Sequence, residues 1–507
     1  MSYISLYFIV FVIGAVALYY ILPLRIRWTS LLLFSLGFYA TWDVRGLIYV
    51  GISLLAAYFT ALGIKKVHDR EDLSKEEAKK KARRVFFPGM LLILALLVLT
   101  KAGRLILASL SGGDGVFSLI VPLGISYYTF ALLGYLADVL WKKDVPERNP
   151  LKLLLYMIYF PQIVEGPIPR HNKLAERLYE GHPFDFTRIA FGMQRVIWGY
   201  FKKLVVADRA NVIVNSVYDP SQSQGGFILL VGVVLSAIQL YADFSGCMDI
   251  AIGVSQCFGI ELEENFRRPF YARTASEFWH RWHITLGTWF RDYVCMPATM
   301  FSSVKDLSRK ARKKWGAQAG RNVTTCTALA ITWVCTGLWH GTGLGYLMWG
   351  IYWGGILIFS TIFEPSLKKL NVRLGIDENA GWFKAFQMLR TFCIFCGGKL
   401  ITQAGSPAAV FGIIKRIVTS FNPWVFFDGS IYELGLERSE FNAMLFGLLV
   451  MWIVGSMQER GVRIRQGVAK APLFIRWAVY ITAIFIVMIW GYYGAGFDAA
   501  SFVYQTF

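Results

Sequence analysis

The feature that most constrains this chain is a series of long apolar runs that carry few or no charges. A helix needs about 20 apolar residues to cross a hydrocarbon core of roughly 30 Å. Because 55% of the 507 residues are hydrophobic and 17% are charged, one soluble core would not bury this surface. We therefore predict an all-α polytopic membrane protein. The longest runs are Ile4 to Leu22, Leu47 to Ile64, Val85 to Leu99, Val116 to Leu140, Val323 to Leu347 and Phe474 to Trp490.

Shorter apolar runs raise the expected total to about ten to twelve membrane helices on the same length rule. The N-terminus, MSYISLYFIV, lacks a basic stretch and a cleavage site, so we expect a retained first helix. No internal repeat or linker divides the chain, which favours one membrane domain over residues 1–507. The shorter runs are Thr29 to Trp42, Ile189 to Val206, Phe227 to Tyr241, Leu344 to Phe363, Met388 to Thr402 and Ala443 to Gly455.

The formal charge of +19 comes from Lys and Arg that concentrate in loops between the apolar runs. The positive-inside rule expects such loops on the cytoplasmic side, so the charge indicates orientation rather than nucleic-acid binding. Counting back from the first loop places the N-terminus outside. The loops predicted to be cytoplasmic are Lys65 to Arg84, Trp141 to Lys152, Lys305 to Arg321 and Gln458 to Arg476.

Seven cysteines lie mostly in or beside apolar segments, which argues against an extracellular disulfide framework. Cys393 and Cys396 form a CxxC pair inside a predicted membrane helix, with no second pair to complete a metal site. We interpret them as packing residues, and we expect no metal and no bound cofactor.

Polar groups at membrane depth are costly and are kept mainly where they face a cavity or do chemistry. The first such place is FPQIVEGPIPRHNKL, Phe160 to Leu174, where prolines, a glycine and Glu165 interrupt an apolar stretch and preclude a straight helix. We expect a re-entrant or broken element that lines a cavity. The alternative is a tight interfacial loop.

The second place covers Gln239 to Gly253 and Glu264 to Val294, where charged residues alternate with aromatic ones. A helix that begins near Thr274 would place Trp279 and His283 on one face, four residues apart. The alternative is an amphipathic helix at the membrane interface, with its tryptophans as an aromatic belt. That alternative leaves the histidine without a reason.

The third place is the apolar span Thr327 to Gly355, whose only Asp, Glu, Lys, Arg or His is His340, near its middle. An isolated imidazole in hydrocarbon is costly unless it is hydrogen-bonded or hydrated. Gly341, Gly343 and Gly345 allow close helix approach or a local break that could admit a substrate. Packing against a neighbouring carbonyl is the alternative to catalysis.

Histidine suits general-base chemistry because its unperturbed pKa of about 6.5 leaves a neutral imidazole near physiological pH. A hydroxyl that attacks an ester-like carbon needs such a base. The chain has no GxSxG elbow, Walker A loop, HExxH or kinase set. On the same helix, the side chain of His280 would point about 100° away from that of Trp279. His280 would therefore lie off the helix face that Trp279 shares with His283.

Taken together, these segments resemble the membrane-bound O-acyltransferases, and specifically the bacterial branch with the alginate O-acetyltransferase and the teichoic acid D-alanylation proteins. The resemblance covers most of the chain, with core motifs in residues 155–360, and the set is highly specific. The motifs are FPQIVEGPIPR (Phe160 to Arg170), DFSGCMDIAIG (Asp243 to Gly253), ENFRRPF (Glu264 to Phe270), EFWHRWHITLGTWFRDYV (Glu277 to Val294) and GLWHG (Gly337 to Gly341).

The resemblance implies a ring of tilted helices with re-entrant segments around a central tunnel, where a cytoplasmic thioester donor meets an extracytoplasmic acceptor. The family's two characteristic histidines map onto His340 and His283. His340 would take the proton of an acceptor hydroxyl as its oxygen attacks the thioester carbonyl, while His283 would hold the donor or relay the proton. The predicted substrate-binding residues are Trp282, Trp339, Trp279, Asn265, Arg291 and Asp292.

The donor stays open because the sequence departs from the alginate-type pattern after Val294, where a strongly basic SRKARKKWGAQAGR stands. That segment could attract the phosphates of acetyl-coenzyme A or an acidic carrier protein with an acyl-phosphopantetheine arm. The additional C-terminal helices, residues 368–507, favour acetyl transfer to a cell-surface polysaccharide over D-alanyl transfer to teichoic acid.

Two alternatives belong to another class. A polysaccharide or lipid transporter is expected to show paired repeats and midplane charges, and a scaffold for a secreted transferase would tolerate loss of His340. The expected location is a bacterial cytoplasmic membrane. The expected partners are the acyl donor or carrier protein, membrane lipid, an extracytoplasmic polysaccharide and a secreted or membrane-anchored acetyltransferase, with no nucleic acid.

Overall fold

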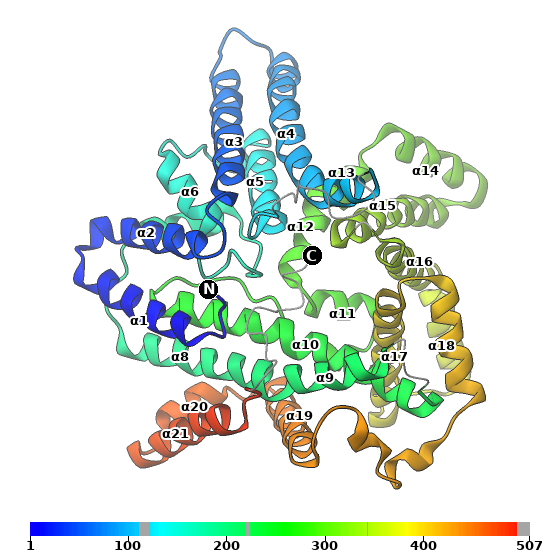
Figure 1. The fold of residues 1–507 in the computed structure, drawn as a ribbon. Helices are drawn as coiled ribbons and strands as arrows, with labels where there is room; N and C mark the ends of the chain where they lie inside the picture. The colour runs from blue at the N-terminus through cyan, green and yellow to red at the C-terminus, as the bar shows by residue number, and fades with distance from the viewer. Residues whose placement is uncertain (111–120, 220–223, 342, 494–507) are drawn as a thin grey trace. The chain divides into compact units, whose positions relative to one another are not determined.

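Helices dominate the part of the chain that the computed structural model describes, namely residues 1–110, 121–219, 224–341 and 343–493 (Figure 1). These residues form no strand beyond one isolated antiparallel bridge between Phe266 and Trp282. The all-helical prediction is therefore confirmed. The chain divides into two compact units whose segments alternate along the sequence, and the prediction of one domain over residues 1–507 stays a prediction.

The first unit comprises Met1–Gly199 and Cys247–Glu264. Within it, two long helices, α3 and α4, pack as an antiparallel pair (Figure 1). Its elements are α1 (Leu6–Ile21), the 3₁₀ turn η1 (Leu24–Ile26), α2 (Arg27–Ala40), α3 (Gly46–His68), α4 (Lys75–Leu110), α5 (Ile125–Leu140), α6 (Pro150–Ile158), α7 (His171–Tyr179), α8 (Phe186–Tyr200) and the end of α10 (Gly226–Cys257).

The residues between α6 and α7 form the broken element that the prolines predict. This segment is buried inside the protein, since Phe160 and Glu165 are both 0% exposed. Its placement at membrane depth rather than at the interface stays a prediction. The Tyr3 hydroxyl donates to Phe160 O (2.6 Å), and Phe160 N–H donates to Ser35 Oγ (3.1 Å). Irregular backbone at membrane depth is tolerated when protein groups bury and bond it in this way.

The second unit comprises Tyr200–Gly246 and residues 265–493 of the described chain. Its elements are the π-helical turn η2 (Phe201–Ala207), α9 (Asp208–Val217), the start of α10, η3 (Pro269–Tyr271), α11 (Ala275–Arg281), α12 (Ile284–Phe290), the π-helical turn η4 (Arg291–Cys295), α13 (Met296–Thr299), α14 (Ser302–Trp315), α15 (Ala317–His340), α16 (Leu344–Arg373), α17 (Gly381–Ala404), α18 (Pro407–Thr419), η5 (Pro423–Phe426), η6 (Ser430–Glu433), α19 (Arg438–Glu459), α20 (Ile464–Lys470) and α21 (Leu473–Trp490).

α15 and α16 approach each other through glycine. A Cβ added to Gly350 would lie 2.5 Å from Trp333 O and 3.2 Å from the Cα of Gly337. A Cβ added to Gly337 would in turn lie 2.7 Å from Tyr346 O. Small residues at such contacts let helix backbones pack closely inside a membrane. The helix pair therefore depends on these two glycines.

The predicted single apolar run over Val323 to Leu347 is wrong. α15 ends at His340 and α16 begins at Leu344, so His340 lies at a helix end rather than near the middle of a continuous span. Gly341 continues in extended backbone, and a Cβ there would collide with the ring of Tyr346. The glycines after His340 allowed either close helix approach or a local break, and the structure has a local break directly after His340. Residue 342 lies outside the described residues.

Six helices among the described residues are long and apolar enough to cross a membrane: α3, α4, α10, α16, α19 and α21. α1 and α5 are shorter apolar helices. A multi-pass membrane protein is thereby confirmed. The other predicted spans lie in α2, α8, α15 and α17, so a total of about ten to twelve stays a prediction. Residues 116–120 of one predicted span and residues 494–507 of the C-terminal region lie outside the described residues.

Candidate active site

The two predicted catalytic histidines lie at helix ends in the second unit. α11 ends at Arg281, and His283 stands between α11 and α12 with left-handed backbone dihedrals (φ 44°, ψ 54°). The prediction that Trp279 and His283 share one helix face is therefore wrong, because the chain leaves the helical path at Trp282. Left-handed backbone costs a non-glycine residue on the order of 1–3 kcal/mol and is concentrated at functional sites.

A short antiparallel pairing is the physical reason for this break. The bridge between Phe266 and Trp282 is flanked by backbone hydrogen bonds of 2.9 and 3.0 Å that join the two segments. These bonds replace the helical hydrogen bonds that a continuous α11 would have made. The pairing also brings Asn265 beside His283.

Asn265 fixes the ring of His283. The Asn265 side chain is 0% exposed, and its Oδ1 accepts from Thr285 N–H (3.1 Å), from the Thr285 hydroxyl (3.0 Å) and from His283 Nδ1 (3.1 Å). A backbone N–H can only donate, so the atom of Asn265 that faces it is the oxygen. Because that oxygen can only accept, Nδ1 of His283 carries the proton and Nε2 carries the lone pair of the neutral ring.

His340 is surrounded by aromatic rings. It is 7% exposed, and its ring lies edge-on to Trp339 (centroids 4.8 Å apart) and to Trp349 (4.7 Å). Tyr346 stacks with the same imidazole at 6.5 Å. The apolar faces of these rings keep bulk water from most of the imidazole. A base in such surroundings acts on a hydroxyl with little competition from solvent.

The ring of Trp339 is close to both histidines. Its ring centroid is 4.8 Å from that of His340 and 6.4 Å from that of His283. Phe244 of α10 packs edge-on against His283 at 4.8 Å. The structure therefore brings four of the predicted site residues, His283, Asn265, Trp339 and His340, into one buried group.

The other two predicted tryptophans pack next to this group. Trp279 contacts the ring of Trp349 at 5.7 Å, and Trp349 in turn contacts His340. Trp282 is 3% exposed and stacks on Phe278 at 5.5 Å. Both side chains thus belong to the aromatic packing around the histidines, and their contact with a substrate stays a prediction.

Arg291 and Asp292 lie in the π-helical turn after α12 and are not among the buried residues. Nε of Arg291 donates to Oδ1 of Asp292 at 2.7 Å, and the Arg291 side chain is 57% exposed. The sequence placed both among the substrate-binding residues. In the structure the guanidinium faces its neighbour and solvent, and a part in substrate binding stays a prediction.

Sequence reasoning missed the rings that contact the histidines, Phe244, Tyr346 and Trp349. Their signal lies in their positions, because Phe244 stands inside the DFSG motif and the other two lie in the first turns of the helix after His340. Each looked like ordinary membrane-helix composition. Only the fold shows which aromatic residue meets an imidazole.

A buried ion group was also missed. Nζ of Lys203 lies 2.6 Å from Oδ1 of Asp243 and 2.9 Å from Oδ1 of Asp208, and all three side chains are largely buried. Two carboxylates around one ammonium compensate a charge that would otherwise be costly at this depth. The group joins the π-helical turn to α10 next to Phe244.

The described residues contain no group of three or more His, Cys, Asp or Glu side chains that could hold a metal ion. All seven cysteines are free thiols. On α17, Cys393 is exposed and Cys396 is buried.

Comparisons with known proteins point to one family. The model of the MBOAT, membrane-bound O-acyltransferase family, matches residues 118–311, which include His283 but not His340. "Probable alginate O-acetylase AlgI" of Pseudomonas aeruginosa is 30% identical over 445 residues, which cover 86% of this chain and 76% of that protein.

Two further relatives carry related names. "Peptidoglycan O-acetyltransferase" of Helicobacter pylori is 26% identical over 404 residues, 74% of this chain and 71% of that protein. "Teichoic acid D-alanyltransferase" of Bacillus subtilis is 28% identical over 289 residues, 55% of this chain and 68% of that protein. All three names describe transfer of an acyl group.

Proposed function

Because the chain belongs to the membrane-bound O-acyltransferase family, we propose that it moves an acetyl group from a cytoplasmic thioester to a hydroxyl of an extracytoplasmic cell-surface polysaccharide. It is a multi-pass membrane O-acyltransferase. The observation that carries the proposal is the buried group in which the ring of Trp339 is close to both His340 and His283, and Asn265 bonds to the ring of His283.

The extent of the alignments supports acetyl as the group transferred. The two relatives named for O-acetylation align with 86% and 74% of this chain, whereas the D-alanyltransferase aligns with 55%. D-alanyl transfer to teichoic acid is the second candidate, since that relative is 28% identical where it aligns. The transporter and scaffold alternatives do not account for family membership.

The transfer needs one base and one leaving thiol. In the proposed step, His340 removes the proton from the acceptor hydroxyl while the oxygen attacks the carbonyl carbon of the thioester. The tetrahedral intermediate then breaks its C–S bond, and the imidazolium of His340 returns the proton to the departing thiolate. An oxygen ester and a free thiol result, so no oxidant, metal or further reactant is required.

His283 is placed to assist because its tautomer is set. Because Asn265 holds the proton on Nδ1, Nε2 of His283 has a lone pair. This lone pair can accept a hydrogen bond from the acyl donor or relay a proton. Positioning of the two reactants contributes as much as the proton transfer itself. The rings of Trp339, Trp282 and Trp279 would shield the reacting atoms from water.

The remaining parts of the proposal concern the two sides of the membrane. The donor is acetyl-coenzyme A or an acyl-phosphopantetheine carrier protein, and the basic helix α14 would attract the phosphates of either one. The acceptor is a polysaccharide outside a bacterial cytoplasmic membrane, and a secreted or membrane-anchored acetyltransferase would complete delivery. Arg291 and Asp292 are proposed to contact the substrate from the exposed turn after α12.

Cells that lack this chain, complemented with the wild-type protein or an empty vector, test the proposal. Ester-linked acetyl and ester-linked D-alanyl groups on surface polymers are released by mild base and quantified. We expect the wild-type protein to restore the acetyl ester and leave D-alanyl unchanged. Restoration of D-alanyl alone would replace the first candidate by the second, and restoration of neither would contradict both.

A further inference from the structure

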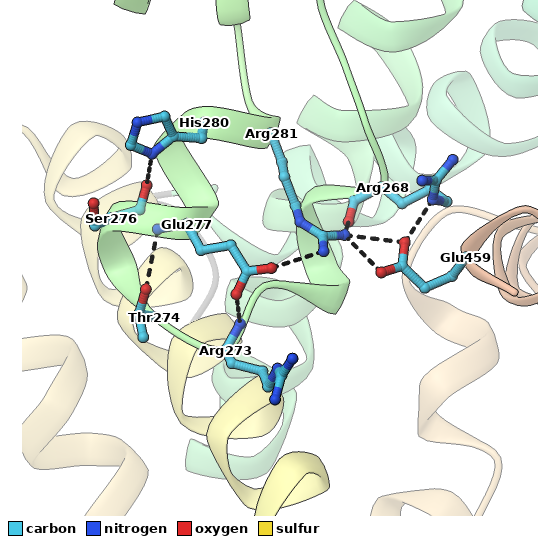
Figure 2. A network of polar contacts seen from close by, with 8 residues as sticks. All are labelled: Arg268, Arg273, Thr274, Ser276, Glu277, His280, Arg281 and Glu459. Atoms are coloured by element: carbon cyan, nitrogen blue, oxygen red, sulfur yellow. Dashed lines mark hydrogen bonds and ion pairs between the residues drawn. The ribbon is translucent and has the colours of Figure 1, made fainter. Parts of the chain in front are cut away.

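The C-terminal helices supply a carboxylate to the segment that carries His283 (Figure 2). Glu459 is the last residue of α19 and accepts from Arg268 Nε (2.6 Å) and from Arg281 Nη1 (3.0 Å). Nη2 of Arg281 also donates to Oε1 of Glu277, one turn earlier on α11, at 2.7 Å. These side chains are between 20% and 31% exposed, so solvent screens them less than a surface pair.

The two arginines stand on the two arms of the antiparallel pairing. Arg268 follows Asn265 on one arm, and Arg281 precedes His283 on the other. Backbone N–H of Arg267 donates to Arg281 O at 2.9 Å, and the Arg281 guanidinium reaches back to Arg268 O at 3.4 Å. The carboxylate of Glu459 therefore joins the two arms at one end of the pairing. At the other end, the arms are joined by the contact between Asn265 and His283.

Both arms contain strained backbone. Arg268 (φ 48°, ψ 62°) and His283 (φ 44°, ψ 54°) adopt the left-handed conformation, which is unfavourable for residues other than glycine. Such conformations persist only where the surroundings hold them. The last turns of α19 hold the backbone around Arg268 in two ways. Glu459 bonds to Arg268, and Ser456 Oγ lies 2.6 Å from the hydroxyl of the nearby Tyr271.

We propose that Glu459 is a positioning residue for acyl transfer: by holding Arg268 and Arg281 together, it sets the imidazole of His283 against Asn265. This inference rests on the proposed part of His283 in the reaction. It also gives the additional C-terminal helices a purpose, since α19 delivers the carboxylate. Loss of that carboxylate removes the bridge between Arg268 and Arg281 and leaves Arg281 with Glu277 alone, so the arms separate and the imidazole shifts. A shift of this kind lowers the turnover number and leaves donor binding in place.

Glu459→Gln and Glu459→Asp test the inference. Inverted membrane vesicles that contain each variant receive radiolabelled acetyl-coenzyme A, and ester-linked label is counted per copy of the protein. We expect Glu459→Gln to lower kcat about tenfold with KM within twofold of the wild-type value. Glu459→Asp, which keeps the charge, should recover most of the loss. Glu364→Gln is the matched control, because it removes the same charge from the exposed pair with Lys368 on α16.

The outcomes separate this inference from the proposed function. Wild-type kcat in Glu459→Gln, alongside an inactive His283→Ala, would overturn the positioning by Glu459 alone. Wild-type kcat in His283→Ala would overturn the proposed part of His283 and, with it, the positioning by Glu459, while acetyl transfer itself would stand. A loss shared equally by Glu364→Gln, or one confined to protein abundance or to KM, would also contradict the inference, because it would reflect general destabilisation or donor binding. Wild-type vesicles that do not incorporate label would contradict acetyl-coenzyme A as the donor, and the same variants are then compared by acetyl ester per copy in whole cells.

Discussion

Asn265 is the residue that bonds directly to the ring of His283. Asn265→Ala deletes the single oxygen that accepts from His283 Nδ1, Thr285 N–H and the Thr285 hydroxyl. Leaving buried donors without an acceptor costs about 1–3 kcal/mol. We expect lower thermal stability and, because the His283 tautomer is no longer fixed, a fall in ester-linked acetyl of about tenfold or more per copy of the protein.

Thr285→Val is the control for this prediction. Valine has nearly the shape of threonine and removes the hydroxyl bond to Asn265, while the Asn265 oxygen that bonds to His283 is kept. Activity within about fivefold of wild type is expected, since one neutral hydrogen bond contributes about 1 kcal/mol. Acetyl ester content and thermal unfolding measure the two variants. Equal losses of activity and stability in both would show that packing, and not the contact with His283, causes the effect.

The sequence predicted these individual residues unevenly. His340 and His283 stood out because each was out of place in apolar or aromatic surroundings, and Asn265 because it lies in a family motif; their roles stay a prediction. Phe244 and Trp349 were not found, since an aromatic ring in a membrane protein carries no signal until its neighbours are known.

Among the elements, the pairing of α15 with α16 gives a direct test. Gly350→Ala would force a Cβ to 2.5 Å from Trp333 O, so the two helices must separate near the end that carries His340. Overpacking of this kind costs about 1–3 kcal/mol. We expect reduced protein abundance, a lower unfolding temperature in detergent and reduced acetyl transfer.

Gly355→Ala on the same helix is the matched control. A Cβ at Gly355 meets nothing within 4 Å, and alanine is the better helix former. Unfolding temperature and activity should equal or exceed those of the wild type. A Gly350→Ala protein as stable as Gly355→Ala would contradict the glycine contact between α15 and α16.

Helix positions were predictable because length and apolar composition depend only on the local sequence. The points at which the chain leaves a helix were not predictable in this way. The chain leaves α11 at Trp282 because that residue pairs with Phe266, and no local pattern announces such a partner. The break after His340 was one of the alternatives that its glycines allowed, and the clash of a Gly341 Cβ with Tyr346 shows why a glycine is needed at that position.

For the whole molecule, orientation in the membrane is the open prediction. The N-terminal amine lies 3.1 Å from Thr41 Oγ1, so the N-terminus and the turn before α3 lie on the same side. The positive-inside rule places that side outside and the turn between α3 and α4 inside. In spheroplasts, a membrane-impermeant maleimide should label Arg45→Cys at once and Glu71→Cys only after permeabilisation, relative to the parent protein. The reverse pattern would invert the orientation.

At this scale the sequence predicted the class of protein and the family, because apolar length and a set of motifs suffice for both. It did not predict the contact between α19 and the segment of His283. Glu459 lies far along the chain from Arg268 and Arg281, and a charged residue near a helix end looks like an ordinary surface residue.

The central claim is that His340 is the base for O-acyl transfer. The most direct test is the ester-linked acetyl content per copy of the protein in cells that produce His340→Ala, with His280→Ala as control. His280 is exposed and its Nδ1 bonds to Ser276 O at 2.7 Å (Figure 2), away from the buried group. We predict a loss of about a hundredfold or more for His340→Ala at normal abundance and no loss for His280→Ala. Wild-type acetylation in His340→Ala would contradict the claim.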